Sequence, residues 1–201
     1  LADREAVAEA LMEVRAGVVF HLAGQASAAR SFVEPAETFR ANVGGTWNVL
    51  EAARQAVPHA RILVVGTSEV YGPTSPGTRT GESAPFAPVS PYALSKAVAE
   101  RCAESWARQH GMEVVRTRSF GHTGPGQNPQ FALPSFARQI AAIERGEAEP
   151  VLRVGNLDVV RDLSDVRDVA QAYLALMERG KAGAAYNVCR GEGVKLRDVV
   201  E

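Results

Sequence analysis

The chain has 201 residues, enough for one sizeable hydrophobic core or for one domain with part of another. Its formal net charge is −1 and it has no run of lysine or arginine, which argues against a surface for nucleic acid or anionic membranes. No apolar run is long enough to span a bilayer, and Cys102 and Cys189 match no metal-binding spacing, so we expect a cytoplasmic protein with reduced thiols.

The two ends of the chain suggest a segment of a longer protein. A helical pattern over residues 3–15 follows Leu1 directly, and the chain stops at Glu201 where another helix is expected. No glycine-rich phosphate loop follows a strand. We therefore expect the first strands of the sheet and that loop to lie outside these residues. Such an isolated segment would expose a hydrophobic sheet edge, aggregate or unfold, and bind dinucleotides poorly.

Residues 17–22 form a short apolar run, which predicts a parallel strand buried on both faces. Ala23, Gly24 and Gln25 follow it. Small residues at the carboxyl end of a strand let a ligand approach the backbone, or they form an ordinary tight turn; the residues alone favour neither. His21 is expected to be a hydrogen-bonded, half-buried strand residue and not a catalyst.

A long helical pattern covers residues 35–56, and a strand is expected over residues 61–66. The strand ends at Thr67, and hydroxyl groups just past a buried strand lie where open α/β sheets bind ligands. The proline-, glycine- and serine-rich residues 73–89 are expected to form a surface loop beside that site.

The most informative stretch begins the expected helix 90–110. Ser90 is a suitable N-cap, and Pro91 fits the first helical position. Tyr92 and Lys96 are four residues apart and share one helical face. The ammonium group favours the phenolate, so we expect the pKa of Tyr92 to fall from about 10 and the residue to act as an acid–base group. Alone, this spacing is more often a surface helix pair.

With Thr67 upstream, Tyr92 and Lys96 resemble the catalytic triad of the extended short-chain dehydrogenase/reductase superfamily, the NAD-dependent epimerase/dehydratase family. Residues 21–25 and 42–46 also resemble segments of that family, although a small helix face for close packing explains the second equally well. The resemblance implies that the catalytic residues are Thr67, Tyr92, Lys96 and Glu69. It implies cofactor contacts for Leu22, Ala23, Gly24, Gln25, Asn42, Tyr92, Lys96, Phe120 and His122.

Residues 119–127 open from an expected strand over 113–118. A segment dense in glycine and proline with one histidine is a binding loop or a turn without a ligand. It resembles the Phe-Asn-His-Thr-Gly-Pro-Gly-Gln segment of nucleotide-sugar enzymes, close to the GDP-4-keto-6-deoxy-mannose reductases. Gly121 stands where those relatives have asparagine, so one substrate hydrogen bond is in doubt.

Residues 151–168 resemble the family's Gly-Asn-Leu, Arg-Asp-Phe and Asp-Val-Arg-Asp run, with Leu163 in place of the phenylalanine. The guanidinium of Arg161 matches the oxygen atoms of a diphosphate. From the residues alone, an ion pair with a nearby aspartate is at least as probable, and the resemblance favours the diphosphate. The substrate-binding residues implied are Ser68, Glu69, Gly121, Asn156 and Arg161.

Helical patterns separate the strands throughout, including expected helices over 133–145 and 166–179 before a last strand at 185–189. We therefore predict an α/β fold, a Rossmann-like doubly wound parallel sheet with part of a small C-terminal substrate domain. The nucleotide-binding part is predicted over residues 1–119 and 165–189, and the substrate-binding part over 120–164 and 190–201. No metal site is expected.

The resemblance implies NAD(P)-dependent reduction of a 4-keto nucleotide-diphosphate sugar. A 4,6-dehydratase or 4-epimerase is the alternative, because in related dehydratases a glutamate at the place of Glu69 acts as a base. A non-catalytic dinucleotide-binding or regulatory module is a further alternative, against which the intact triad argues. The cofactor is NADP or NAD. No nucleic acid or membrane partner is expected, and a homodimer is expected to form through helices 35–56 and 90–110.

Overall fold

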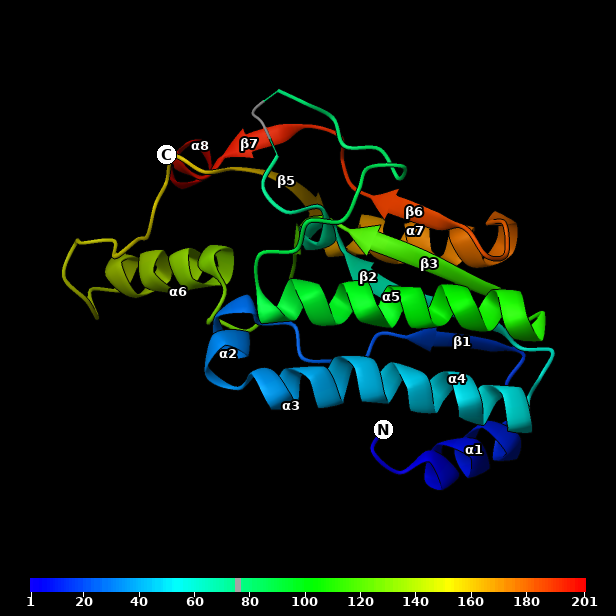
Figure 1. Ribbon diagram of the computed structural model, residues 1–201. Coiled ribbons are helices and arrows are strands. Elements are labelled where there is room, and N and C mark those ends of the chain that lie inside the picture. The colour runs from blue at the N-terminus through cyan, green and yellow to red at the C-terminus, as the bar shows by residue number, and fades with distance from the viewer. Residues whose placement is uncertain (75–76) are drawn as a thin grey trace. The chain divides into compact units, whose positions relative to one another are not determined.

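The computed structural model describes residues 1–74 and 77–201, which form two compact units (Figure 1). Unit 1 comprises Leu1–Ser119 and Gln171–Val188, and unit 2 comprises Phe120–Ala170 and Cys189–Glu201. The sequence-based division assigned residues 165–189 to the first part, whereas unit 1 takes only 171–188 of them.

Unit 1 is built on a four-stranded parallel sheet, which confirms the predicted fold class. Its strands, in spatial order, are β1 (Val18–His21), β2 (Arg61–Thr67), β3 (Val114–Ser119) and β6 (Ala185–Val188). All four carboxyl ends lie at one edge of the sheet, and Thr67 is the last residue of β2, paired with Ser119. That edge is where parallel sheets bind ligands.

The prediction that the first strand is buried on both faces is wrong. β1 lies at the edge of the sheet, next to β2 alone among the described strands. Val18 is 52% exposed and Phe20 37% exposed, whereas His21 is buried. Side chains alternate along a strand, so Val18 and Phe20 point to the same face of β1, and that face is left uncovered.

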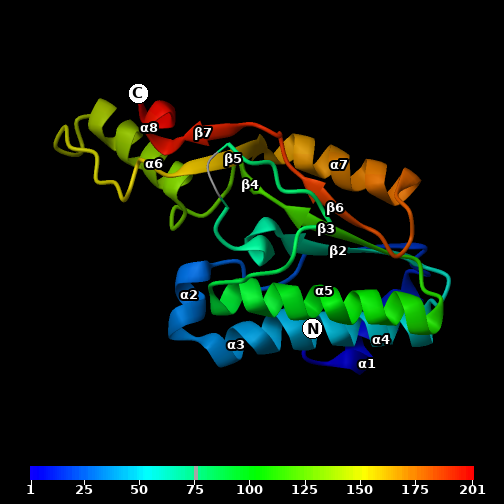
Figure 2. The same ribbon diagram turned by 45° about the horizontal axis from the view of Figure 1, so that its top comes forward.

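The helices α4 and α5 lie side by side along one face of this sheet, and α7 covers the other face (Figures 1 and 2). The core between sheet and helices includes Leu50, Ile62, Val114 and Trp106. The helical elements of unit 1 are α1 (Arg4–Glu13), α2 (Ala28–Val33), α3 (Pro35–Phe39), η1 (Arg40–Gly44), α4 (Gly45–Ala56), η2 (Ser68–Tyr71), α5 (Pro91–His110) and most of α7 (Val166–Arg179). Of α7, only the residues from Gln171 onward belong to unit 1.

The predicted helix over residues 35–56 forms, with one irregular turn. The pattern over residues 35–56 corresponds to α3 and α4 joined by η1, a single π-helical turn. Such turns insert one extra residue into an α-helix and are frequent at functional sites. Residues 73–74 and 77–89 of the predicted loop have no regular helix or strand and are mostly exposed, while residues 75–76 lie outside the described part.

Unit 2 contains a small mixed sheet of β4 (Gly121–Thr123), β5 (Val160–Asp165) and β7 (Gly193–Lys195). β4 runs parallel to β5, and β7 runs antiparallel to it. The helices are α6 (Ala132–Glu144), close to the predicted range 133–145, and α8 (Leu196–Val200). The sequence analysis missed β4, β7 and α2, because elements of three to six residues are too short to show periodicity.

Candidate active site

The start of α5 sets the position of Tyr92 and Lys96. Ser90 caps the helix by accepting a hydrogen bond from the backbone N–H of Ala93, and Pro91 occupies the first turn, as predicted. Tyr92 is only 8% exposed. Lys96 lies one turn later, and its Nζ donates a hydrogen bond of 2.7 Å to the carbonyl oxygen of Val65 in β2. This face of α5 is therefore fastened to the carboxyl end of β2.

Thr67 completes the group. Its side chain is buried at the end of β2, where its hydroxyl accepts a hydrogen bond of 3.3 Å from the backbone N–H of Glu69. The phenol of Tyr92 lies close enough to this side chain for Thr67 to lower its pKa. The structure thus brings together the three residues that resemble a dehydrogenase triad, although they come from different elements.

Burial decides the protonation of both titratable members. It raises the pKa of Tyr92 to about 12; the side chain of Thr67 acts in the opposite direction, and the charges of Glu69 and Tyr173 add to the rise. Burial also lowers the pKa of Lys96 to about 8. The expectation that Lys96 would lower the pKa of Tyr92 is therefore wrong for this structure. Desolvation of a buried phenolate outweighs the other effects, and the Lys96 ammonium is directed at the Val65 carbonyl.

Asn42, in the π-turn η1, connects this group to the segment after β1. Its Oδ1 accepts a hydrogen bond of 2.8 Å from the backbone N–H of Gln25, and its Nδ2 donates to the Gln25 carbonyl at 3.0 Å. Nδ2 also donates to Ser95 Oγ at 2.9 Å. One fully buried amide therefore holds both the segment after β1 and the first turns of α5.

A buried chain of hydrogen bonds extends this connection to β1. Thr46 donates to the Asn42 carbonyl at 2.6 Å, so its oxygen accepts from His21 Nε2 at 2.9 Å, and His21 carries its proton on Nε2. Ser95 donates to the Tyr92 carbonyl at 2.7 Å. Burial lowers the pKa of His21 to about 4, with smaller contributions from positive charges including Lys96. The sequence analysis expected His21 to be hydrogen-bonded but did not find Thr46 or Ser95.

Residues 22–25, which follow β1, form an accessible stretch of backbone that we call the ledge. Leu22, Ala23 and Gly24 are exposed, and Gln25 is partly buried. A Cβ atom placed on Gly24 would lie 2.7 Å from Asn42 Oδ1 and 3.7 Å from Lys96 Nζ. Any larger residue would require Asn42 to move, so glycine at this position leaves the backbone accessible beside Lys96. This geometry fits the approach of a flat ligand to the backbone.

Ser68 and Glu69 open the short helix η2 directly after Thr67. Ser68 is partly buried and Glu69 is exposed. The charge of Glu69 raises the pKa of Tyr92, which shows that the carboxylate lies within electrostatic reach of the phenol. Both predicted substrate residues of this segment are thus next to the group formed by Thr67 and Tyr92.

The other predicted binding residues belong to unit 2 and are mostly exposed. His122 is exposed and its Nδ1 hydrogen-bonds the Phe120 carbonyl at 3.0 Å. A Cβ atom on Gly121 would lie 2.8 Å from the Asp162 carbonyl oxygen. The close pairing of β4 with β5 therefore leaves no room here for the asparagine side chain of the relatives unless the strands shift. Asn156 is exposed and accepts a hydrogen bond of 2.9 Å from the Asp158 N–H.

Arg161 is exposed on β5, and its Nη1 donates a hydrogen bond of 3.0 Å to the Val160 carbonyl. The nearby aspartates considered as ion-pair partners are Asp162, Asp165 and Asp168. Asp162 accepts from the backbone of residues 190 and 191, and Asp165 pairs with Arg167, while Asp168 forms no ion pair with Arg161 in the described ranges. Within the described ranges, no ion pair includes Arg161. Its guanidinium therefore remains available to an anion.

Over residues 1–74 and 77–201, no group of three or more histidine, cysteine, aspartate or glutamate side chains is arranged to hold a metal ion. In the same ranges, no helix combines the length and apolarity needed to cross a bilayer.

Comparison with known proteins gives matches over the whole chain. Residues 1–201 match the protein family described as GDP-mannose 4,6 dehydratase. The GDP-6-deoxy-D-mannose reductase of Pseudomonas aeruginosa is 40% identical over 185 residues, which cover 91% of this chain and 60% of the reductase. A probable dTDP-glucose 4,6-dehydratase of Sinorhizobium fredii is 31% identical over 100% of this chain and 58% of its own length.

A solved structure described as RMD from Pseudomonas aeruginosa complexed with NADPH has a TM-score of 0.95 and 37% identity. The match covers 99% of this chain and 67% of that one. The chain thus spans about 60% of the length of the curated relatives that it matches.

Proposed function

The chain belongs to the GDP-mannose 4,6 dehydratase family, as its resemblance predicted, and from this premise we propose that the protein reduces a 4-keto sugar nucleotide with NADPH or NADH. The proposed substrate is a nucleotide-diphosphate sugar of the GDP-4-keto-6-deoxy-mannose type. The observation that carries the proposal is the placement of Thr67, Tyr92 and Lys96 together at the carboxyl end of β2.

Tyr92 is proposed as the proton donor. With a pKa raised to about 12, its phenol keeps its proton near neutral pH, which suits the acid needed when a ketone becomes an alcohol. The proton passes from the Tyr92 oxygen to the carbonyl oxygen of the substrate. Thr67 orients the phenol, and its hydroxyl also hydrogen-bonds the carbonyl oxygen of the substrate. Lys96, with a pKa of about 8, is mostly charged at neutral pH and holds hydroxyl groups of the cofactor ribose.

The ledge after β1 fits a dinucleotide, because Gly24 leaves the backbone bare beside Asn42 and Lys96. When bound, the nicotinamide supplies the hydride that reduces C4 of the sugar. The residues proposed to hold it in unit 1 are Leu22, Ala23, Gly24, Gln25 and Asn42. In unit 2, Phe120 and His122 are proposed as cofactor contacts, and Gly121, Asn156 and Arg161 as substrate contacts.

The second candidate is a 4,6-dehydratase or 4-epimerase acting on a nucleotide sugar. One observation favours it: the carboxylate of Glu69 lies within electrostatic reach of Tyr92, where a second base would be needed. A dehydratase restores its bound cofactor in each cycle and so consumes none overall. A non-catalytic dinucleotide-binding module is the third candidate, and it predicts cofactor binding without turnover.

The test is oxidation of NADPH by the full-length protein in the presence of GDP-4-keto-6-deoxy-mannose. We expect stoichiometric consumption and a fall in kcat of about 10²- to 10⁴-fold for Tyr92→Phe, the usual contribution of general acid–base catalysis. Equal rates for the two proteins would remove Tyr92 from the mechanism.

Glu69→Gln separates the enzyme candidates. A reductase does not need a second base, so this variant should keep its kcat for NADPH oxidation, while KM can rise because Glu69 is also a predicted substrate contact. If the protein instead converts GDP-mannose to a 4-keto sugar without net consumption of cofactor, and Glu69→Gln abolishes that conversion, the dehydratase candidate is correct.

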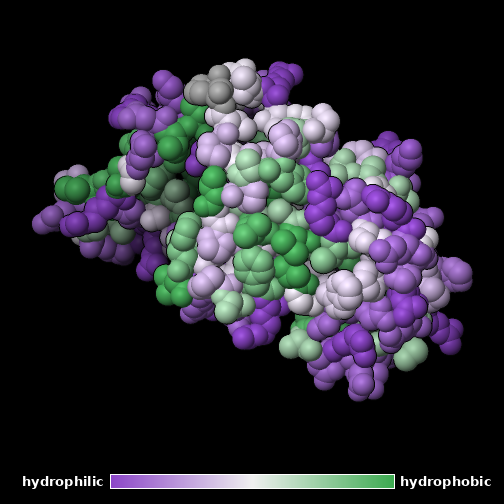
Figure 3. All heavy atoms as spheres, viewed as in Figure 1, coloured by the Kyte–Doolittle hydropathy of each residue, from purple (hydrophilic) through white to green (hydrophobic). Residues whose placement is uncertain are grey.

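A homodimer through residues 35–56 and 90–110 is also proposed. Figure 3 shows a hydrophobic patch over α4 and α5, where Trp47 and Leu94 are each 45% exposed. A shallow groove of about 510 Å³ runs over it, lined by Trp47, Phe86, Pro88, Leu94, Ala97, Val98, Arg101, Cys102 and Ser105. Exposed apolar patches on paired helices suit a second copy of the same surface.

Light scattering of Trp47→Glu and Leu94→Glu should give monomers, while Val33→Glu, at an exposed valine of α2, should leave the mass unchanged. Dimers of all three variants would contradict the proposed interface.

The compartment proposed is the cytoplasm, where the thiol of Cys102 stays reduced.

A further inference from the structure

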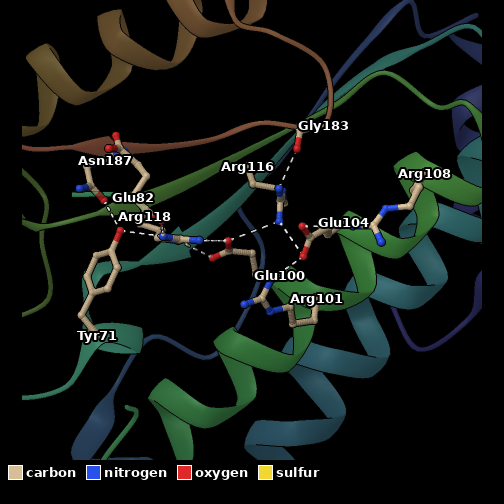
Figure 4. A network of polar contacts seen from close by, with 10 residues as sticks. All are labelled: Tyr71, Glu82, Glu100, Arg101, Glu104, Arg108, Arg116, Arg118, Gly183 and Asn187. Atoms are coloured by element: carbon tan, nitrogen blue, oxygen red, sulfur yellow. Dashed lines mark hydrogen bonds and ion pairs between the residues drawn. The ribbon is translucent and has the colours of Figure 1, made fainter. Parts of the chain in front are cut away.

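A buried group of charges lies between α5 and the sheet of unit 1 (Figure 4). Glu100 of α5 is 2% exposed, and Arg116 and Arg118 of β3 are each 5% exposed. Arg118 forms an ion pair with Glu100 through two of its nitrogens: Nη2 donates to Oε1 at 2.7 Å, and Nε lies 3.1 Å from both carboxylate oxygens. Neither the proposed proton transfer nor the cofactor ledge uses this pair.

The third nitrogen of Arg118 faces different segments. Its Nη1 donates hydrogen bonds of 2.8 Å to the Tyr71 hydroxyl and 2.8 Å to the Glu82 carbonyl (Figure 4). The guanidinium also lies 4.6 Å from the ring centre of Phe86 and 5.2 Å from that of Tyr71. The loop before α5 and the helix η2 thus both contact the side chain of Arg118.

These contacts share a feature. Three segments that adjoin the triad residues contact Arg118. Helix η2, which ends at Tyr71, directly follows Thr67, and the loop with Glu82 and Phe86 leads into α5, which carries Tyr92, Lys96 and Glu100. One side chain therefore joins all three segments.

We infer that Arg118 is a positioning residue for the triad, an inference that rests on the proposed reductase function. Tyr92, Lys96 and Glu100 form one stripe of α5, spaced by four residues. Lys96 is held by the Val65 carbonyl, and Glu100 Oε2 lies 3.7 Å from the position of a Cβ atom on Gly66, the residue before Thr67. The Glu100–Arg118 pair fixes how far α5 is displaced along β2, and so whether Tyr92 meets Thr67.

Arginine is suited to this role for a geometric reason. A planar guanidinium presents donors in fixed directions, so one residue can hold a carboxylate, a hydroxyl and a carbonyl at once, whereas lysine has a single point charge. Buried ion pairs are not reliably stabilising, since apolar residues of similar volume often replace them without loss. A role in geometry therefore explains this pair better than a role in stability.

Arg116 is a matched control on the same strand and equally buried. Its Nη1 lies 3.5 Å from Glu100 and 3.5 Å from Glu104, and its Nη2 donates to the Gly183 carbonyl at 2.7 Å. Among the residues described, it forms no hydrogen bond or ion pair with η2 or the loop before α5. It shares the charge and the burial of Arg118 but not the connection to the three segments.

The experiment compares Arg118→Lys, Arg116→Lys and the apolar double variant Glu100→Leu/Arg118→Met in the full-length protein. Thermal unfolding, kcat and KM for the 4-keto sugar nucleotide, and native-state hydrogen exchange are measured on each. We expect kcat to fall about 100-fold in both variants that change Arg118, the effect of a displacement of about 1 Å at a reacting group. KM should change little, and Arg116→Lys should keep the wild-type kcat.

Hydrogen exchange gives a readout that does not depend on turnover. The amides of Gly72 and Ala87, which donate to the carbonyls of Glu69 and Val70, should lose protection in the Arg118 variants and keep it in Arg116→Lys. The inference is overturned if kcat falls equally in Arg116→Lys and Arg118→Lys, or if the folded Arg118 variants keep wild-type kcat and protection. A wild-type protein without turnover would refute the proposed reductase function, and the exchange pattern would still decide whether Arg118 anchors the segments.

Discussion

The candidate residues of unit 1 and those of unit 2 are held in different ways. In unit 1 the residues of the triad and Asn42 are buried or partly buried, and they are bonded to partners far along the chain, as Asn42 is to Ser95, 53 residues away. In unit 2 they are exposed and bonded within two residues, as His122 is to Phe120 and Arg161 to Val160. The fold brings the first group together from distant segments, and we call these the assembled residues. The second group lies on the surface with local hydrogen bonds only, and we call these the displayed residues.

This difference indicates what each unit contributes. Transfer of a proton requires groups fixed within a fraction of an ångström before the substrate arrives, and burial with several hydrogen bonds provides that order. Capture of an anionic ligand requires only an accessible cation, which can adjust on binding. We therefore expect changes in unit 1 to alter stability and kcat, and changes in unit 2 to alter KM.

The largest expected effect concerns acid stability. Burial lowers the pKa of His21 to about 4 from an ordinary 6.5, so between these values the unfolded chain binds a proton that the folded chain excludes. The free energy of unfolding should therefore fall as the pH drops from about 6.5 towards about 4, by about 3 kcal/mol from this residue. Urea titrations across this range should show a smaller loss for His21→Gln, whose amide can still donate to Thr46.

His122 is the control from unit 2, since it is exposed. His122→Gln should follow the wild-type curve. If the two histidine variants behave alike, then buried and exposed groups do not differ in the way proposed, and the acid sensitivity comes from carboxylates.

The second effect compares two asparagines. Asn42→Ala leaves the Gln25 N–H without its partner and removes a buried side chain, which should lower the free energy of unfolding by about 2 kcal/mol. Asn156→Ala, at an exposed position, should change it by less than about 0.5 kcal/mol. Chemical denaturation of both variants checks this, and a similar loss for each would contradict the division into assembled and displayed residues.

Much of unit 1 could be predicted from the sequence because its signals are local. Ser90 and Pro91 mark the start of α5, the spacing of Tyr92 and Lys96 sets them on one face, and Thr67 follows an apolar strand. What could not be predicted depends on burial in three dimensions. No spacing reveals that the pKa of Tyr92 rises, because desolvation depends on neighbours from several elements.

Partners that come from distant segments were equally hidden. Ser95 and Thr46 are ordinary small polar residues in a sequence, and only the π-turn at Asn42 brings them into one chain of hydrogen bonds. Arg118 has the same character, because it lies in an expected strand and its contacts to Glu100 and Tyr71 are not adjacent in sequence. The family resemblance named the reacting groups but not the side chains that hold them in place.

The smallest effect is expected in unit 2 and is the most specific to binding. Arg161→Met removes an exposed guanidinium that is not engaged in an ion pair within the described ranges. If this group binds the diphosphate, KM should rise about tenfold, equivalent to about 1.4 kcal/mol, while kcat is retained.

Arg167→Met is the matched control for this prediction, because Arg167 is also exposed but already pairs with Asp165. Raising the salt concentration should increase KM for the wild type and for Arg167→Met, and should affect Arg161→Met less, since screening acts on the charge that has been removed. A loss of kcat with unchanged KM in Arg161→Met would show instead that this displayed residue takes part in the chemical step, and the contrast between the two units would no longer hold.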